Sequence, residues 1–310
     1  MKTTALVFSG QGSQYVGMAA DIIAADDRAR TMAQRANDVL GYDLVEIMSQ
    51  GPEDQLRQTR YTQPALFLHE AILLATTPAQ DGMRAVAGHS LGEYSALYAA
   101  GVLSFDDALQ LVQRRASLMF DAGDRLPGTM VAVVGMDDDA VRTLCAELNK
   151  GGDMVIVPAN FNSPGQVVIS GSAEYVRTCM PLFKERGAKL VKELQVSGAF
   201  HSPLLAEAQA GLAESIKATS FADASVPVYV NVSAAPVTAA ADLQAAAIAQ
   251  LTAPVLWTDT MNAMWNDGIT SFLEVGPGKV LQGLIKRTLT EATLDGIDTW
   301  ADVQRFSEHA

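Results

Sequence analysis

The chain has 310 residues, 49% of them hydrophobic and 18% charged, which is enough for one large domain or two moderate ones with a sizeable core. Its formal net charge of −13 disfavours a nucleic-acid-binding protein, because such proteins usually present a basic surface. The N-terminal apolar run is too short for a signal peptide, and no run reaches the length of a membrane span. We therefore expect a cytoplasmic protein without membrane contact.

The N-terminal part reads as a strand, a glycine loop and helices. A short apolar strand at 5–8 leads into the loop Ser9–Gln14. This loop is either a simple strand-to-helix turn or a set of backbone N–H groups facing a developing anion; it lacks the Lys-Ser/Thr of a phosphate-binding loop. Residues 16–50 are predicted to be helical with a stop near Gly41, and a further helix begins near Pro64.

The sequence Gly-His-Ser-Leu-Gly at 88–92 contains a G-x-S-x-G motif between an apolar strand at 83–87 and a helix at 94–100. G-x-S-x-G alone is common by chance, but strand, tight turn and helix together are typical of a nucleophile elbow. Glycines beside the serine let strand and helix approach closely and leave its hydroxyl exposed above the helix N-terminus. Ser90 is therefore a candidate nucleophile.

Residues 105–120 are predicted to form a helix whose faces follow from a rotation of about 100° per residue. Arg114 falls on the polar arc and is expected on the surface. Arg115 falls inside the apolar arc, where a buried guanidinium requires an anion. A structural ion pair with a buried carboxylate, or a side chain that extends to the surface, would satisfy Arg115 equally well.

A different rhythm begins at residue 128. The order strand, helix, strand, strand, helix, strand predicts a ferredoxin-like unit at 128–195, inserted into a main domain made of 1–127 and 196–310. Its strands are expected at 130–134, 154–157, 166–170 and 189–194, its helices at 137–148 and 172–186, and a turn at 160–165. Cys145 and Cys179 fall in the helices and are expected to be buried thiols rather than a disulfide.

The main domain then resumes with a strand, a helix, a strand and a helix. These elements are expected at 226–232, 258–266, 271–275 and 279–288. Beyond Glu291 the sequence gives no usable pattern.

A serine nucleophile needs a base, and the chain has four histidines. His309 adjoins the C-terminus and His69 lies within a helix. His89 is next to Ser90, so its side chain should diverge from the hydroxyl and form a structural hydrogen bond. By elimination, His201 in a loop is the candidate base. Many acidic residues lie between serine and histidine, and spacing selects none of them as a third member.

Five motifs, in this order, resemble the malonyl-CoA:acyl-carrier-protein transacylases, a family of bacterial fatty-acid synthesis enzymes and polyketide synthase domains. They are Gly-Gln-Gly-Ser-Gln at 10–14, Gly-His-Ser-Leu-Gly-Glu at 88–93, Arg115, Gly-Ala-Phe-His at 198–201 and Glu-Val-Gly-Pro-Gly at 274–278. The resemblance extends over nearly the whole chain. It implies an α/β-hydrolase-like domain with a central, mostly parallel sheet and a ferredoxin-like insert.

The resemblance also implies residue roles. Ser90 would carry the malonyl group, with His201 as general base and then general acid. Arg115 would bind the malonyl carboxylate. The other implied roles are the backbone amides of Gln11 and Leu91 as oxyanion hole, the Gln250 main-chain carbonyl as the group that orients the histidine, and Gln63, Asn160 and Phe200 near the acyl group or thioester.

Substrate and partner follow from the same resemblance. Malonyl-CoA would be the donor and phosphopantetheinylated acyl carrier protein the acceptor, with no cofactor, no metal and a monomeric enzyme. Phe200 should fill the space that a 2-methyl group needs, whereas Gly198 departs from the usual His-Ala-Phe-His and leaves larger acyl groups open. Candidate carrier contacts are Lys184, Arg186, Lys189, Lys192, Lys286 and Arg287, which also fit a solvated basic face. A serine esterase or thioesterase on the same fold is the alternative.

Overall fold

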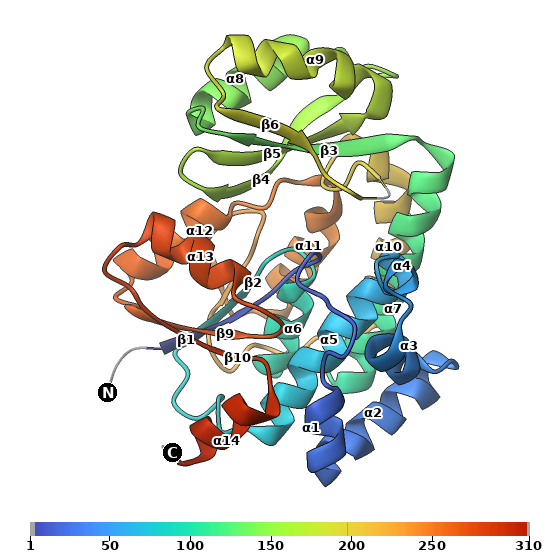
Figure 1. Ribbon diagram of the computed structural model, residues 1–310, viewed down its shortest axis with the longest axis vertical. Helices are drawn as coiled ribbons and strands as arrows, with labels where there is room; N and C mark the ends of the chain where they lie inside the picture. The colour runs from blue at the N-terminus through green and yellow to red at the C-terminus, as the bar shows by residue number, and fades with distance from the viewer. Residues whose placement is uncertain (1–3, 197, 309–310) are drawn as a thin grey trace.

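The computed structural model describes residues 4–196 and 198–308, which form two sheets with helices packed around them (Figure 1). The larger sheet has the strand order β10-β9-β1-β2-β7-β8, and all its pairs are parallel except β7 with β8. Its strands are β1 (Thr4–Phe8), β2 (Ala85–Gly88), β7 (Val228–Tyr229), β8 (Pro236–Val237), β9 (Ser271–Val275) and β10 (Thr293–Ile297). The expected central, mostly parallel sheet is confirmed.

Helices cover both faces of this sheet because its strands are apolar on both sides. In β1, Leu6 and Phe8 pack into a core shared with α2, α5, α6 and α7, whereas Ala5 and Val7 pack against α12 and α13. The helices are α1 (Ala20–Ala25), α2 (Asp27–Leu40), α3 (Leu44–Gln50), α4 (Glu53–Leu56), α5 (Thr59–Thr76), α6 (Gly92–Ala99), α7 (Phe105–Arg125), α10 (Ala206–Ala218), α11 (Ala240–Ala249), α12 (Trp257–Asn266), α13 (Val280–Thr288) and α14 (Trp300–Glu308), with short 3₁₀ turns at Pro203–Leu205 and Gln250–Thr252.

The second sheet is antiparallel, in the order β4-β5-β3-β6. Its elements are β3 (Gly128–Val134), α8 (Asp138–Leu148), β4 (Ile156–Ser163), β5 (Gln166–Ser172), α9 (Ala173–Glu185) and β6 (Leu190–Glu193). The helices α8 and α9 cover its outer face, and the other face turns toward the larger sheet (Figure 1). Met130 and Val168 on that inner face join the core of the larger part. Cys145 and Cys179 are buried free thiols, as expected.

Several predicted boundaries were wrong. The helical region predicted at 16–50 begins only at Ala20 and is three helices, because the carboxylates of Asp26 and Asp43 cap the starts of α2 and α3. The predicted stop near Gly41 is confirmed, since Gly41 caps the end of α2. The predicted turn at 160–165 is mostly strand: β4 runs on to Ser163, through two bulges. The predicted strand at 226–232 shrinks to β7, with two residues.

The part beyond Glu291, for which no element was predicted, adds β10 at the edge of the larger sheet and then α14. Among the described residues, no helix is both long and apolar enough to cross a membrane.

Candidate active site

Ser90 lies on a sharp turn between β2 and α6, at the carboxyl edge of the larger sheet. Its backbone is left-handed, with φ of 54°. A Cβ on Gly88 would lie 1.9 Å from the carbonyl carbon of Gly92, and one on Gly92 would lie 2.2 Å from the Phe8 oxygen. Only glycine fits at either position, so the two glycines of the motif are required by the close approach of strand and helix.

His201 contacts the serine directly: its Nε2 lies 2.7 Å from Ser90 Oγ. Its Nδ1 faces two main-chain carbonyl oxygens, of Gln250 at 3.0 Å and Ala253 at 3.1 Å. Since a carbonyl only accepts, Nδ1 carries the hydrogen and Nε2 is free to accept the serine proton. Burial, together with the charge of Arg115, lowers the pKa of His201 to about 3, so the ring is neutral at physiological pH.

The other histidines are placed differently. His89 is half-buried, with its Nε2 2.8 Å from Asn162 Oδ1 and its ring against Trp257, which agrees with the expected structural hydrogen bond. His69 is packed inside α5, with its Nε2 2.8 Å from the main-chain oxygen of Asp298. His309 lies outside the described residues.

Arg115 is fully buried on α7, whereas its neighbour Arg114 is exposed. Its guanidinium donates hydrogen bonds to Gln63 Oε1 at 2.8 Å, Gln250 Oε1 at 2.9 Å and Ser90 Oγ at 3.0 Å. Within residues 4–196 and 198–308 it forms no ion pair, and its Nε has no hydrogen-bond partner. The alternatives of a structural ion pair and of a surface-reaching side chain are therefore wrong.

Glu93, one turn along α6 from Ser90, is a buried carboxyl in the same region. Burial raises its pKa to about 7, against opposing contributions from the Asn231 N–H and the charge of Arg115. Burial likewise lowers the pKa of Arg115. The site thus holds a guanidinium that only neutral oxygens contact, which is the arrangement expected where an anion is to bind.

The two amides expected to form an oxyanion hole have suitable surroundings. Gln11 follows β1 and Leu91 follows Ser90, at the same edge of the parallel sheet. In the described part of the chain neither backbone N–H donates to another backbone group. Leu91 is buried and Gln11 is half-buried, and without a backbone partner both N–H groups are available to a developing negative charge.

A cavity of about 170 Å³ opens over Ser90, between the two sheets. Phe200, Asn160 and Gln11 line it, as do Met130 and Val168 of the second sheet. Gln63 is not among the residues that line this cavity, but it accepts a hydrogen bond from Arg115.

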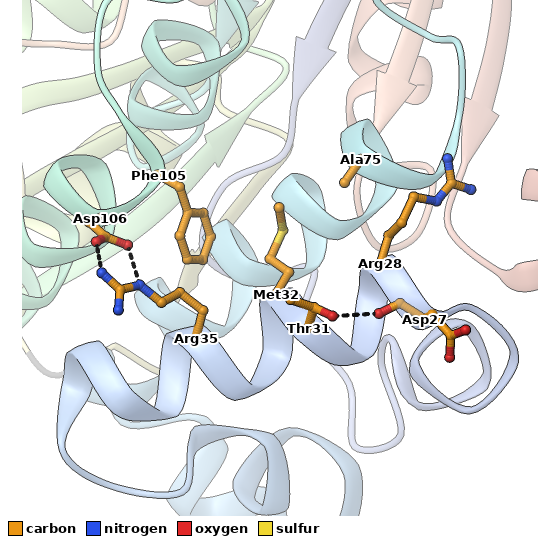
Figure 2. A pocket seen from close by; sticks show the side chains of 8 residues that line it. All are labelled: Asp27, Arg28, Thr31, Met32, Arg35, Ala75, Phe105 and Asp106. Carbon is orange, nitrogen blue, oxygen red and sulfur yellow. Dashed lines mark hydrogen bonds and ion pairs between the residues drawn. The ribbon is translucent and has the colours of Figure 1, made fainter.

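A second hollow, of about 600 Å³, lies between α2, the end of α5 and the start of α7. Figure 2 shows the side chains of Phe105 and Met32 lining it and the Arg35–Asp106 ion pair at one end. It contains no predicted site residue and no nucleophile beside a base, so the chemistry belongs to the smaller cavity.

Asn231, just after β7, is a site residue that the sequence did not reveal. Its Oδ1 accepts from the Ser90 N–H at 2.8 Å, and its Nδ2 donates to the Gly88 oxygen at 2.7 Å. The Gln250 side-chain amide donates a hydrogen bond of 2.8 Å to the main-chain oxygen of Ser90. These bonds fix the strained backbone of Ser90 from both sides.

No group of three or more His, Cys, Asp or Glu that could hold a metal ion occurs among the described residues.

Comparison with known proteins gives a consistent result. The family model for the acyl transferase domain matches residues 5–305. The malonyl CoA-acyl carrier protein transacylase of Staphylococcus aureus (strain COL) is 39% identical over 309 residues, all of both chains.

Solved structures agree with this match. An acyl carrier protein S-malonyltransferase from Vibrio cholerae superposes with a TM-score of 0.91 at 39% identity, covering 98% of this chain and 99% of that one. A malonyl-transacylase solved in complex with a type II PKS acyl-carrier protein superposes with a TM-score of 0.93 at 37% identity over the whole of both chains. The chain therefore belongs to the acyl transferase domain family, among its malonyl-CoA:acyl-carrier-protein transacylases.

Proposed function

We propose that this protein transfers the malonyl group from malonyl-CoA to the phosphopantetheine thiol of acyl carrier protein through a malonyl-serine intermediate. One observation carries the proposal: Ser90 Oγ lies 2.7 Å from a neutral His201 and 3.0 Å from a buried guanidinium that no carboxylate pairs. The first contact supplies a nucleophile with its base, and the second supplies the charge that a dicarboxylic acyl group would neutralise.

The first half-reaction forms the acyl-enzyme. His201 Nε2 takes the Ser90 proton as Oγ attacks the thioester carbonyl, and the Gln250 and Ala253 carbonyls stabilise the resulting imidazolium through Nδ1–H. The amides of Gln11 and Leu91 would bind the oxyanion. When the tetrahedral intermediate collapses, the thiol of CoA leaves with the proton from His201.

The second half-reaction is the reverse with another thiol. His201 removes the proton of the phosphopantetheine thiol, sulfur attacks the malonyl-serine carbonyl, and Ser90 regains its proton. The malonyl carboxylate would pair with Arg115 throughout, replacing contacts with neutral amide oxygens. A general esterase has no use for a buried arginine at its nucleophile, which disfavours that alternative.

We also propose the finer description of the fold: an α/β-hydrolase-like domain of 1–127 and 196–310 with a ferredoxin-like insert at 128–195. The strand order β4-β5-β3-β6 with α8 and α9 on one face supports the insert. One chain supplies Ser90, His201 and Arg115, which supports a monomer. A CoA thioester as substrate supports a cytoplasmic enzyme that needs no further cofactor.

The proposal is tested by mixing the protein with malonyl-CoA and measuring its intact mass. Wild type should gain one malonyl group and lose it when holo acyl carrier protein is added. Ser90→Ala should gain none, while Ser49→Ala, on α3, should behave as wild type. Malonyl on the Ser90→Ala variant, or loss of the group to water as fast as to carrier protein, would refute the transferase mechanism.

A further inference from the structure

Glu70, on α5, is a fully buried carboxyl that the mechanism above does not use. Its Oε1 accepts a hydrogen bond of 2.8 Å from the Ser9 hydroxyl. Ser9 is itself fully buried and directly follows β1, two residues before Gln11. The carboxyl is therefore joined to the first residue of the loop that carries one of the two proposed oxyanion amides.

A second hydroxyl continues the contact into this loop. Ser13 Oγ lies 2.9 Å from the Gly10 oxygen, to which it donates, and 3.2 Å from Ser9 Oγ. The carboxyl of Glu70 thus holds Ser9, and the hydroxyl of Ser13 holds the Gly10 oxygen. Gln11 lies between Gly10 and Ser13, in the part of the loop that this contact closes.

The loop after β9 closes this junction from the other side. A Cβ on Gly276 would lie 2.7 Å from Ser9 Oγ and 2.8 Å from Glu70 Oε1, so only glycine leaves room for their hydrogen bond. The carboxylate of Glu274 accepts from the backbone N–H groups of Leu281 and Gln282 at the start of α13. The motif at 274–278 thus supports the site from a distance.

We propose that Glu70 is a positioning residue for acyl transfer: through Ser9 it holds the loop that presents the Gln11 N–H to the reacting carbonyl. This inference rests on the proposed function. Glu70 touches no reacting atom; its effect passes through Ser9.

The surroundings of Glu70 favour its neutral form. Burial raises its pKa to about 8, against opposing contributions from the hydroxyls of Ser95 on α6 and Ser9, while the charge of Glu274 on β9 raises it further. Oε2 has no hydrogen-bond partner among the described residues, so an ionised carboxyl would be poorly solvated. Once ionised, Glu70 would also place a negative charge beneath the loop that must stabilise an oxyanion.

Three substitutions separate these effects. Glu70→Gln keeps an oxygen that accepts from Ser9 but cannot ionise. Glu70→Leu removes the acceptor, and Ser9→Ala removes the donor. Ser49→Ala, whose hydroxyl donates to the Val45 oxygen within α3, is the control for loss of one half-buried serine hydroxyl.

The measurement is the malonylation of Ser90 by malonyl-CoA in single turnovers, followed by intact mass from pH 6 to 9.5. It gives the maximal rate and the midpoint concentration, which is the malonyl-CoA concentration at half the maximal rate. At pH 7, Glu70→Leu and Ser9→Ala should lower the maximal rate by about 10-fold, less than outright loss of an oxyanion donor, with little change in midpoint concentration. Glu70→Gln should match wild type at pH 7. Above pH 8 the maximal rate of Glu70→Gln should exceed that of wild type, because Glu70 becomes ionised in wild type.

The inference is overturned if Ser9→Ala and Glu70→Leu keep the full rate, or if Glu70→Gln has the pH profile of wild type. If Glu70→Leu does not fold, Ser9→Ala and the Glu70→Gln pH profile decide the question. Absence of malonylation in wild type would instead remove the proposed function, so the two failures are distinguishable.

Discussion

Replacing Arg115 by alanine should change which acyl group the enzyme prefers. Arg115 is fully buried, and its contacts in the free protein are neutral oxygens of Gln63, Gln250 and Ser90. A malonyl carboxylate would give the guanidinium its first anionic partner, whereas an acetyl group would leave it buried and unpaired. The variant should therefore lose malonyl transfer far more than acetyl transfer.

The expected size follows from the burial. Removing one partner of a buried charge pair costs roughly 2–5 kcal/mol. At about 1.4 kcal/mol per tenfold, kcat/KM for malonyl-CoA should fall between roughly 30-fold and several thousand-fold. Arg115 also donates to Ser90 Oγ, so some loss is common to both substrates. The informative quantity is therefore the acetyl-to-malonyl ratio of kcat/KM, which should rise.

The assay compares kcat/KM for malonyl-CoA and acetyl-CoA in wild type, Arg115→Ala and Arg114→Ala. Arg114 precedes Arg115 on the same helix but is exposed, so its variant should keep the wild-type ratio. Equal losses of both activities in Arg115→Ala would show that the arginine serves the structure or the nucleophile alone. A shifted ratio in Arg114→Ala would refute the reasoning from burial.

Three further predictions concern pH, acyl size and the carrier protein. Since burial lowers the pKa of His201 to about 3, its base form is lost only when pH falls through that low value. The kcat/KM for malonyl-CoA should therefore persist below pH 6.5, the ordinary pKa of histidine. A fall in kcat/KM centred at the ordinary pKa would contradict the lowered pKa of His201. Phe200→Ser should raise the methylmalonyl-to-malonyl ratio of kcat/KM, because Phe200 lines the cavity over Ser90; an unchanged ratio would place the 2-methyl group elsewhere. Charge reversal at the exposed Lys286 and Arg287 should raise KM for carrier protein and spare malonyl-CoA, and an unchanged KM would exclude this surface.

The parts of the site that the sequence predicted are those governed by local geometry. The elbow around Ser90 follows from two glycines four residues apart, and both are required by contacts shorter than any Cβ permits. The inward direction of Arg115 follows from helical periodicity over a single helix, α7 (Phe105–Arg125). Neither inference needed a partner distant in the chain.

The parts that the sequence missed depend on distant partners. Asn231 lies 141 residues from Ser90 in sequence, and only the pairing of β2 with β7 brings its amide to the elbow. Likewise β10 lies at the edge of the sheet and has one buried residue, Ile297, so its sequence lacks the apolar run of β9. Strand β4 continues beyond its apolar start because Asn160 and Phe161 pair with β5, and the Phe161 N–H donates to the oxygen of the distant Val255.

A single physical cause, burial, accounts for both the reactivity and the proposed selectivity of this site. Burial lowers the pKa of His201, which keeps the ring neutral and able to accept the Ser90 proton. The same burial deprives Arg115 of water, and the neutral oxygens around it compensate only part of that loss. Burial raises the pKa of Glu93 to about 7, so its carboxyl is only partly ionised at neutral pH and cannot fully balance the charge of the guanidinium. A substrate that brings its own carboxylate supplies the charge that the folded chain leaves out, so selectivity for malonyl over acetyl would arise from desolvation of an arginine, while the shape of the cavity at Phe200 would act only on the 2-methyl group.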